Sequence, residues 1–119
     1  MKKVLVVEDV DFNRDLLVQL LEDKYQVIEA VNGQEGVELA ERERPELILM
    51  DLSLPIMDGW EATKRIKANN ELRSIPVIAL TAHAMVGDQE KALAAGCDDY
   101  LVKPLDEDIL MAMIQRYLG

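Results

Sequence analysis

The sequence predicts an α/β protein in which an open parallel sheet carries helices on both faces. Two observations support this fold class. Short apolar runs and segments with helical spacing alternate five times along the chain, which is the pattern of sheets built from repeated strand–helix units. The runs at 3–7, 46–50 and 76–80 are dominated by Val, Ile and Leu, as expected for strands that are covered on both faces.

Five apolar runs are predicted as strands. They are 3–7, 26–30, 46–50, 76–80 and 99–103. The first run leads directly into Glu8 and Asp9, and the third leads into Asp51. A carboxylate at the end of a buried strand needs an explanation, because burial of an unpaired charge is costly.

Five helical segments are predicted between and after the strands. They are 12–23, 33–43, 58–69, 84–95 and 106–118. The apolar residues of four segments recur at helical spacing and define predicted stripes: Phe12, Leu16, Leu17, Leu20 and Leu21; Val37, Leu39 and Ala40; Trp60, Ala62, Ile66 and Ala68; and Ile109, Leu110, Met113, Ile114 and Leu118. Asp58 and Asp106 are predicted N-caps, and Gly96 is a predicted helix stop.

The Asn32-Gly33 pair has two interpretations. Such a pair favours a tight β-hairpin turn. The residues that follow it are rich in Glu and lack the alternation of a strand. We therefore predict a loop that leads into a helix.

Length and composition narrow the function classes. A chain of 119 residues, of which 50% are hydrophobic, fits one domain over residues 1–119. No apolar run approaches the ~20 residues of a membrane span, and a single cysteine, Cys97, excludes an internal disulfide. The net charge of −10 argues against binding to nucleic acid, which needs a basic surface. We expect a cytoplasmic protein that binds cations or other proteins, and neither a membrane nor nucleic acid.

The predicted fold brings the strand-end acids together. Five-stranded sheets of this kind commonly have the flavodoxin-like order 2-1-3-4-5, and ligands bind beyond the carboxyl ends of the strands where the order reverses. Strands one and three are then neighbours, so Glu8 and Asp9 would share one crevice with Asp51. Thr81 and Lys103 end strands four and five at the same edge of the sheet.

This set of groups suits a cation and a phosphoryl group. Three neighbouring carboxylates repel one another unless a cation joins them, and clustered oxygen ligands are typical of Mg²⁺, with Mn²⁺ as an alternative. Lys103 supplies a positive charge for a phosphate, and Thr81 supplies a hydroxyl donor. A carboxylate such as Asp51 can attack a phosphoryl donor and form an aspartyl phosphate.

The chain resembles a response-regulator receiver domain, the fold of the chemotaxis regulators, over essentially its whole length. The matching features are "VVEDVDFN", "MDLSLPIMDG", "ALTAHA" and "AGCDDYLVKP", in this order and at the spacing of that family. Each motif is weak alone, but together, each at a strand end, they are very specific. The resemblance implies a phosphorelay protein, similar to receivers of hybrid kinases and to single-domain response regulators.

The resemblance also implies a role for each site residue. Asp51 would accept the phosphoryl group, and the chain would catalyse only its own phosphorylation and dephosphorylation, which makes it a switch rather than an enzyme. The implied metal ligands are Glu8 through water, Asp9, Asp51 and the main-chain carbonyl of Ser53. Thr81 and Tyr100 would form the switch. Lys103 would act beside Asp51 in the phosphoryl transfer, and the Lys103–Pro104 bond would be cis. In addition, Ser53 and His83 lie where family members tune hydrolysis of the phosphate.

Other functions fit the residues less well. A haloacid-dehalogenase-type phosphatase also uses a strand-end Asp, but it typically has a second Asp two positions later, where this chain has Ser53. A topoisomerase-primase-type metal site needs a similar pair of Asp residues, which the motif around Asp51 lacks. A flavodoxin-type FMN binder needs a Ser/Thr/Gly-rich loop after strand one, where this chain has EDVDFN. A receiver-like adaptor that works without phosphorylation stays open as an alternative.

Because 119 residues leave no room for an output domain, we expect the signal to pass by protein contact. By resemblance, a histidine kinase or phosphotransfer protein would dock on helix 12–23 at Asn13, Arg14 and Leu17. A downstream protein target would use the face formed by 84–95, 99–103 and 106–118. The same face serves dimer formation in the family, so we expect a monomer or a weak dimer.

Overall fold

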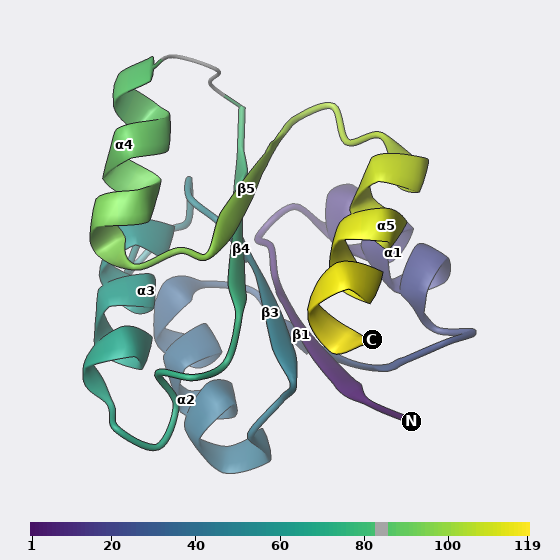
Figure 1. The fold of residues 1–119 in the computed structure, drawn as a ribbon, viewed down its shortest axis with the longest axis horizontal. Helices are drawn as coiled ribbons and strands as arrows, with labels where there is room; N and C mark the ends of the chain where they lie inside the picture. Colours follow the sequence, from purple (N-terminus) through teal and green to yellow (C-terminus); the bar gives the residue numbers. More distant parts are fainter. Residues whose placement is uncertain (83–85) are drawn as a thin grey trace.

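The computed structural model describes residues 1–82 and 86–119, which form five strands and five helices in alternation (Figure 1). The strands are β1 (Lys3–Val7), β2 (Gln26–Ala30), β3 (Leu47–Asp51), β4 (Val77–Thr81) and β5 (Asp99–Val102). The helices are α1 (Asp11–Leu21), α2 (Gly33–Glu43), α3 (Gly59–Ala68), α4 (Val86–Ala95) and α5 (Glu107–Leu118). Every predicted element is confirmed with bounds that shift by two residues at most, although the predicted start of the fourth helix, 84–85, lies outside the described residues.

The five strands form one parallel sheet in the order β2-β1-β3-β4-β5. This is the order that the sequence predicted. The chain first passes from β1 outward to β2 and then returns to β3 on the other side of β1, so the direction of winding reverses between β1 and β3. A ligand site is expected beyond the carboxyl ends of these two strands.

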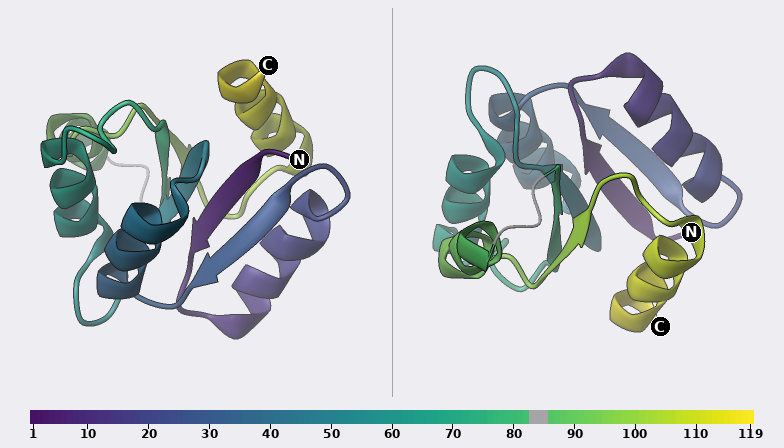
Figure 2. Two further views of the ribbon diagram at one scale, coloured as in Figure 1. Left: turned by 90° about the horizontal axis from the view of Figure 1, so that it is seen from below. Right: turned by 90° about the horizontal axis from the view of Figure 1, so that it is seen from above.

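Two hydrophobic cores lie on opposite faces of the sheet. Helices α1 and α5 cover one face, and α2, α3 and α4 lie over the other (Figures 1 and 2). Successive strand residues contribute to opposite cores, as the pleat requires: Leu5, Val7, Ile48, Met50, Val77 and Ala79 to one, and Val4, Val6, Leu47, Leu49, Ile78 and Leu80 to the other. This explains why these strands are apolar at every position rather than at alternate positions.

The helix ends follow the predicted capping. Asp58 accepts a hydrogen bond from the amide of Glu61, and Asp106 accepts one from the amide of Ile109. Asn32 caps α2 in the same way, which confirms the loop-to-helix interpretation over a hairpin. Helix α4 ends before Gly96, whose φ of +105° lies in the left-handed region that favours glycine.

Some residues of the predicted apolar stripes are exposed to solvent in the structure. In α1 only Leu17 and Leu21 are buried, whereas Phe12 is 70% and Leu16 45% exposed. Ala68 in α3 and Ile109 in α5 are exposed as well. Helical spacing in the sequence identifies an apolar stripe on a helix. In these helices the stripe is wider than the part of the helix surface that the core covers, so its outer residues are exposed.

Candidate functional site

Asp51 is the last residue of β3, and its side chain is held at the carboxyl edge of the sheet. Its Oδ1 accepts a hydrogen bond from the amide of Ser53 at 3.0 Å, and its Oδ2 accepts one from Nζ of Lys103 at 3.0 Å. The residue is 4% exposed. Helix α3 begins directly against this strand end, because a Cβ at Gly59 would lie only 2.2 Å from the carbonyl oxygen of Asp51. Glycine at the start of α3 therefore permits the close approach that encloses Asp51.

Glu8 follows β1 and is fully buried. Its amide donates to the carbonyl of Ala30 at 3.0 Å, which extends the pairing of β1 with β2 by one residue. Its Oε1 accepts from Lys103 Nζ at 2.9 Å, and its Oε2 accepts from the amide of Val10 at 3.2 Å. The buried carboxylate is thus hydrogen-bonded at both oxygens, as a buried charge must be.

Lys103 joins β5 to the acids of β1 and β3. Burial by itself lowers the pKa of Lys103, but hydrogen bonds and charge attraction from Glu8 and Asp51 outweigh it and leave the pKa raised. The ammonium group therefore stays charged and offsets part of the charge of the two carboxylates. The Lys103 amide donates to the carbonyl of Thr81 at 2.7 Å, and the following bond to Pro104 is cis.

Asp9 completes an acidic cluster. One carboxylate oxygen from each of Glu8, Asp9 and Asp51 lies within 4.8 Å of the other two. Asp9 is the least buried of the three, and none of the described residues donates a hydrogen bond to its carboxylate. Three carboxylates and one ammonium leave a net negative charge, and hard oxygen ligands at this spacing fit a divalent cation such as Mg²⁺.

The remaining predicted residues lie around this cluster. Thr81 is the last residue of β4, is 7% exposed and pairs with Val102 of β5. Tyr100 lies on the same neighbouring strand, opposite Ala79, and is half-buried against the core that α2 and α3 cover. Ser53 is exposed in the loop after β3. His83 lies outside the described residues.

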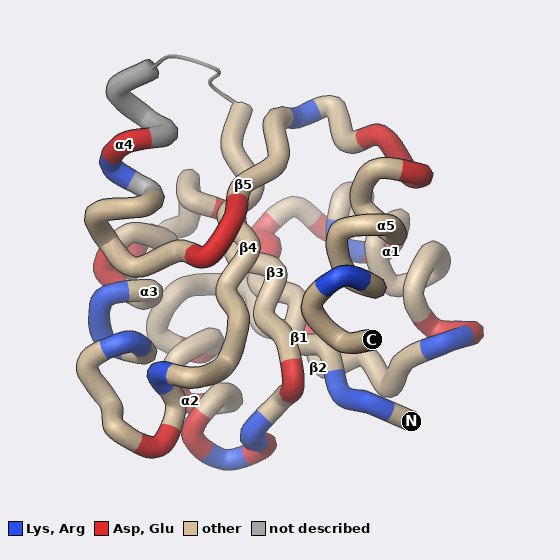
Figure 3. Tube along the Cα trace, in the orientation of Figure 1, with Lys and Arg blue, Asp and Glu red and all other residues tan. Residues whose placement is uncertain are grey.

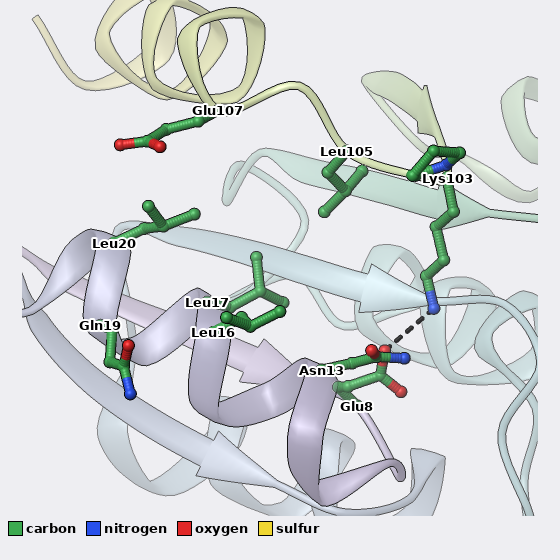
Figure 4. A pocket seen from close by; sticks show the side chains of 10 residues that line it. Glu8, Asn13, Leu16, Leu17, Gln19, Leu20, Lys103, Leu105 and Glu107 are labelled. Atoms are coloured by element: carbon green, nitrogen blue, oxygen red, sulfur yellow. Dashed lines mark hydrogen bonds and ion pairs between the residues drawn. The ribbon is translucent and has the colours of Figure 1, made fainter.

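An open cavity adjoins Glu8 and Lys103 (Figure 4). It has a volume of about 830 Å³ and lies between α1 and the segment that leads from β5 into α5. Leu16 and Leu20 form its α1 side, Leu105 and Glu107 lie across from them, and Lys103 reaches down to Glu8 at one end. Exposed Leu16 and partly buried Leu20 of the predicted apolar stripe therefore border this groove.

The residues predicted for docking on α1 lie at or beside this groove. Asn13 and Leu17 both line it, although Leu17 is only 3% exposed and also packs in the core. The Arg14 side chain is 13% exposed, and each of its three side-chain nitrogen atoms donates a hydrogen bond within the chain. The surplus of leucines in the α1 stripe was the available sequence signal for the groove. The i,i+3 spacing of Asp11 and Arg14 signals one of the Arg14 bonds, whereas the bonds to Glu8 and Glu29 left no signal in the sequence.

The distribution of charged residues and the length of the helices are relevant to the kinds of partner that the chain could bind. Lys and Arg positions are interspersed with Asp and Glu positions along the trace (Figure 3), and the net charge is −10. Within residues 1–82 and 86–119, every helix is too short or too polar to traverse a lipid bilayer.

A doubly wound sheet with a buried aspartate, an acidic cluster and a lysine at its switch point defines the class of receiver domains. The chain belongs to the response regulator receiver domain family, which it matches over residues 4–115. It is 45% identical over 119 residues to the polar-differentiation response regulator DivK of Brucella anthropi, covering 99% of this chain and 97% of that protein. It is therefore a receiver-type signalling protein of two-component phosphorelay systems.

Solved structures agree with this assignment. The receiver domain of the sensor histidine kinase PA1611 of Pseudomonas aeruginosa, with a magnesium ion coordinated in the active site cleft, has a TM-score of 0.92 and 41% identity, over 99% of this chain and 98% of that one. The receiver domain of Saccharomyces cerevisiae Ssk1, in complex with the histidine phosphotransfer protein Ypd1, has a TM-score of 0.91 and 35% identity, over 98% and 88%. The chemotaxis protein CheY4 of Vibrio cholerae has a TM-score of 0.92 and 30% identity, over 98% of both chains.

Proposed function

We propose that residues 1–119 form a single-domain phosphorelay switch in which Asp51 accepts a phosphoryl group from a phosphohistidine of a histidine kinase or a phosphotransfer protein. The observation that carries this proposal is the Asp51 carboxylate, 4% exposed and 3.0 Å from Lys103 within an acidic cluster. Such a carboxylate is a nucleophile in fixed orientation with a positive charge beside it, as phosphoryl transfer requires.

In the proposed reaction, one Oδ atom of Asp51 attacks the phosphorus atom while the bond from phosphorus to the imidazole nitrogen of the donor breaks. The released imidazole takes up a proton from solvent, and Asp51 becomes an acyl phosphate. Lys103 exchanges its contact with Asp51 for a contact with a phosphoryl oxygen, where it offsets the added charge. Water later attacks the phosphorus atom, the bond between phosphorus and the Asp51 oxygen breaks, and inorganic phosphate leaves with the carboxylate restored, so that the chain catalyses its own phosphorylation and dephosphorylation only.

The chain's own ligands for a divalent cation would be the carboxylates of Asp9 and Asp51, Glu8 through water, and the main-chain carbonyl of Ser53. When bound, Mg²⁺ or Mn²⁺ supplies positive charge to the phosphoryl oxygens. The carboxylate oxygens within 4.8 Å of one another support this proposal, and so does the magnesium ion in the PA1611 receiver domain. Lys103 shares two of these carboxylates, and we infer that it occupies part of the cluster when no cation is bound.

The phosphodonor would dock over the groove of Figure 4. Its apolar border, formed by Leu16, Leu20 and Leu105, lies directly beside Glu8 and Lys103. A partner helix that covers these leucines would bring its phosphohistidine to the same edge of the sheet as Asp51. The Ssk1 receiver in complex with Ypd1 supports a partner of this kind.

The signal would leave through the face of α4, β5 and α5, in a cytoplasmic protein that acts as a monomer or weak dimer. Thr81 and Tyr100 would couple Asp51 to this face. Thr81 would donate a hydrogen bond to the phosphoryl group, and its movement would allow the Tyr100 ring to turn inward. Their places at the end of β4 and on the adjacent strand β5 support this coupling.

Incubation with acetyl phosphate and Mg²⁺ tests the proposal. The wild-type chain should gain one acid-labile phosphoryl group by intact-mass spectrometry, and the Asp51→Asn variant should gain none. Asp58→Asn is the matched control, because Asn retains the capping bond of α3 and the change removes the same charge from the same loop. A folded wild-type protein that takes up no phosphoryl group would favour the phosphorylation-independent adaptor, and repeated hydrolysis of a phosphate ester would favour a phosphatase.

A further inference from the structure

We propose that Arg14 is a positioning residue for the acidic cluster, and that its hydrogen bonds to the loop after β1 set the affinity of the cluster for a divalent cation. This inference rests on the proposed function, because it concerns the same cation site. Arg14 does not belong to the cluster and would not touch the cation. It would act through the position of the peptide that carries Asp9.

The guanidinium of Arg14 joins three separate parts of the chain. Its Nη1 donates to the carbonyl of Glu8 at 3.0 Å, its Nη2 to Oδ1 of Asp11 at 2.6 Å, and its Nε to Oε1 of Glu29 on β2 at 3.2 Å. Its side chain is 13% exposed, whereas those of Asp11 and Glu29 are 86% and 47% exposed. One largely covered guanidinium therefore joins the carbonyl of the buried Glu8 to two more exposed carboxylates.

The bond to the Glu8 carbonyl has a specific consequence for Asp9. That carbonyl belongs to the peptide unit that connects Glu8 to Asp9, and the unit is planar. A hydrogen bond to its oxygen fixes the orientation of the plane, and with it the point from which the Asp9 side chain leaves the backbone. The Glu8 amide is already fixed by Ala30, so Arg14 secures the other end of the residue.

Asp9 differs from the other two acids in its hydrogen bonds. Among the described residues, none donates a hydrogen bond to its carboxylate, in contrast to Glu8 and Asp51, which both accept from Lys103. Before a cation binds, the position of the Asp9 carboxylate therefore depends on its backbone and not on a hydrogen bond from the described residues. A ligand that is already in place loses less conformational entropy on binding than one that must be ordered.

Charge and geometry predict opposite effects for a change at Arg14. If only its positive charge matters, removal of Arg14 should strengthen cation binding, because the cluster becomes more negative. If its hydrogen bonds matter, removal should weaken binding, as loss of residues that orient metal ligands typically does by 10- to 100-fold. Arg14→Lys separates the two, because Lys keeps the charge but cannot reproduce the planar fork of donors.

The test is the Mg²⁺ dissociation constant of the unphosphorylated protein, measured by isothermal titration calorimetry at fixed ionic strength. We expect about tenfold weaker binding in Arg14→Met and several-fold weaker binding in Arg14→Lys. In metal-free protein, ¹⁵N relaxation should show increased mobility of the Asp9 amide in both variants. Arg65→Lys and Arg65→Met are matched controls, because Arg65 also lies on a helix and pairs with a carboxylate, Glu61, without contact to the loop after β1.

Other results would contradict either the positioning role of Arg14 or the cation site itself. Unchanged Mg²⁺ affinity in a folded Arg14→Lys variant would overturn the positioning role, whatever its effect on the free energy of unfolding. Tighter binding in Arg14→Met with no change in Arg14→Lys would assign the effect to charge alone and would also overturn it. Asp9→Asn should nearly abolish binding. If the wild type and Asp9→Asn bind Mg²⁺ equally or not at all, the proposed cation site itself is wrong, and the affinity claim for Arg14 falls with it.

Discussion

Nζ of Lys103 lies 3.0 Å from Oδ2 of Asp51, although 52 positions separate the two residues in the sequence. The same ammonium group also contacts Glu8, so one cation just after β5 neutralises part of the charge at the ends of β1 and β3. Before phosphorylation this contact stabilises two buried carboxylates. Afterwards the same lysine would lie beside the phosphoryl oxygens, so a single side chain would serve both states.

Replacement of Lys103 by Met should separate these two roles. Loss of the ammonium leaves Glu8 and Asp51 buried without a counter-charge, so the free energy of unfolding in EDTA should fall by about 3 kcal/mol. Mg²⁺ should bind several-fold more tightly, because the lysine no longer shares the carboxylates, yet acetyl phosphate should label the variant more slowly. Urea unfolding and calorimetry measure these effects, with the exposed Lys24→Met as control. Equal stability, or weaker Mg²⁺ binding, would contradict the assigned contacts.

Thr81→Ala should accept the phosphoryl group but show a smaller conformational response to it across residues 86–103. A shift of a two-state equilibrium from 1:99 to 99:1 needs ~5.5 kcal/mol, and one charge-assisted hydrogen bond supplies roughly 1.5–3 kcal/mol. The variant should therefore respond partially, with smaller amide chemical-shift changes across residues 86–103 on addition of beryllofluoride and Mg²⁺. Thr63→Ala controls for loss of a buried threonine hydroxyl. A full response in Thr81→Ala would refute the coupling.

Most residues of the acidic site could be predicted from the sequence, and the reason is physical. In a parallel sheet every strand ends at the same edge, so residues that follow apolar runs, such as Glu8, Asp51 and Thr81, are brought together by topology alone. The groove was not predictable in this way. Helical spacing placed Leu16 in the apolar stripe of α1. Whether a residue of that stripe is covered by the core or borders a groove depends on how α1 packs against the sheet and α5.

Contacts between distant side chains were also beyond the sequence. The spacing of Arg14 and Glu29 has no periodic relation, and their contact exists only because α1 packs beside β2. The backbone at Ile56 is a second example. Nothing in its residue type predicts a positive φ, because β-branched residues rarely adopt that region.

Replacement of Ile56 by Asn should stabilise the protein. Ile56 has a φ of +67°, and the amide of Met57 donates to the carbonyl of Pro55 across it at 2.7 Å, which forms a strained γ-turn. The side chain is 84% exposed, so little burial is lost. Because Asn tolerates this backbone region, we expect the free energy of unfolding to rise by about 1 kcal/mol.

Urea unfolding measures this gain, and Ile109→Asn is the control. Ile109 is also exposed but lies in α5 with ordinary helical geometry, so the same substitution should bring no gain there. A gain at both positions would point to a general effect of polarity, and a loss at Ile56 would contradict the strain.

Cys97 should make the free energy of unfolding depend on pH in the alkaline range. Burial raises the pKa of the Cys97 thiol, against a smaller opposing effect of its hydrogen bond with Thr63. The folded protein therefore keeps this proton to higher pH than the unfolded chain, and stability is lost as pH rises above the unfolded value of about 8.5. Relative to Cys97→Ala, the wild type should become less stable between pH 8 and 10. Titrations of Lys103 and Tyr117 cancel in this comparison, and parallel pH profiles would contradict the prediction.

The identity of the phosphorylated residue tests the central claim most directly. The protein is labelled with acetyl phosphate and Mg²⁺, treated with borohydride, which reduces an acyl phosphate to an alcohol, and digested for tandem mass spectrometry. We expect a single reduced residue, homoserine in place of Asp51, only in labelled samples. Reduction at Glu8, Asp9 or Asp58 instead, or a phosphoryl group on Ser53 that survives borohydride, would contradict it.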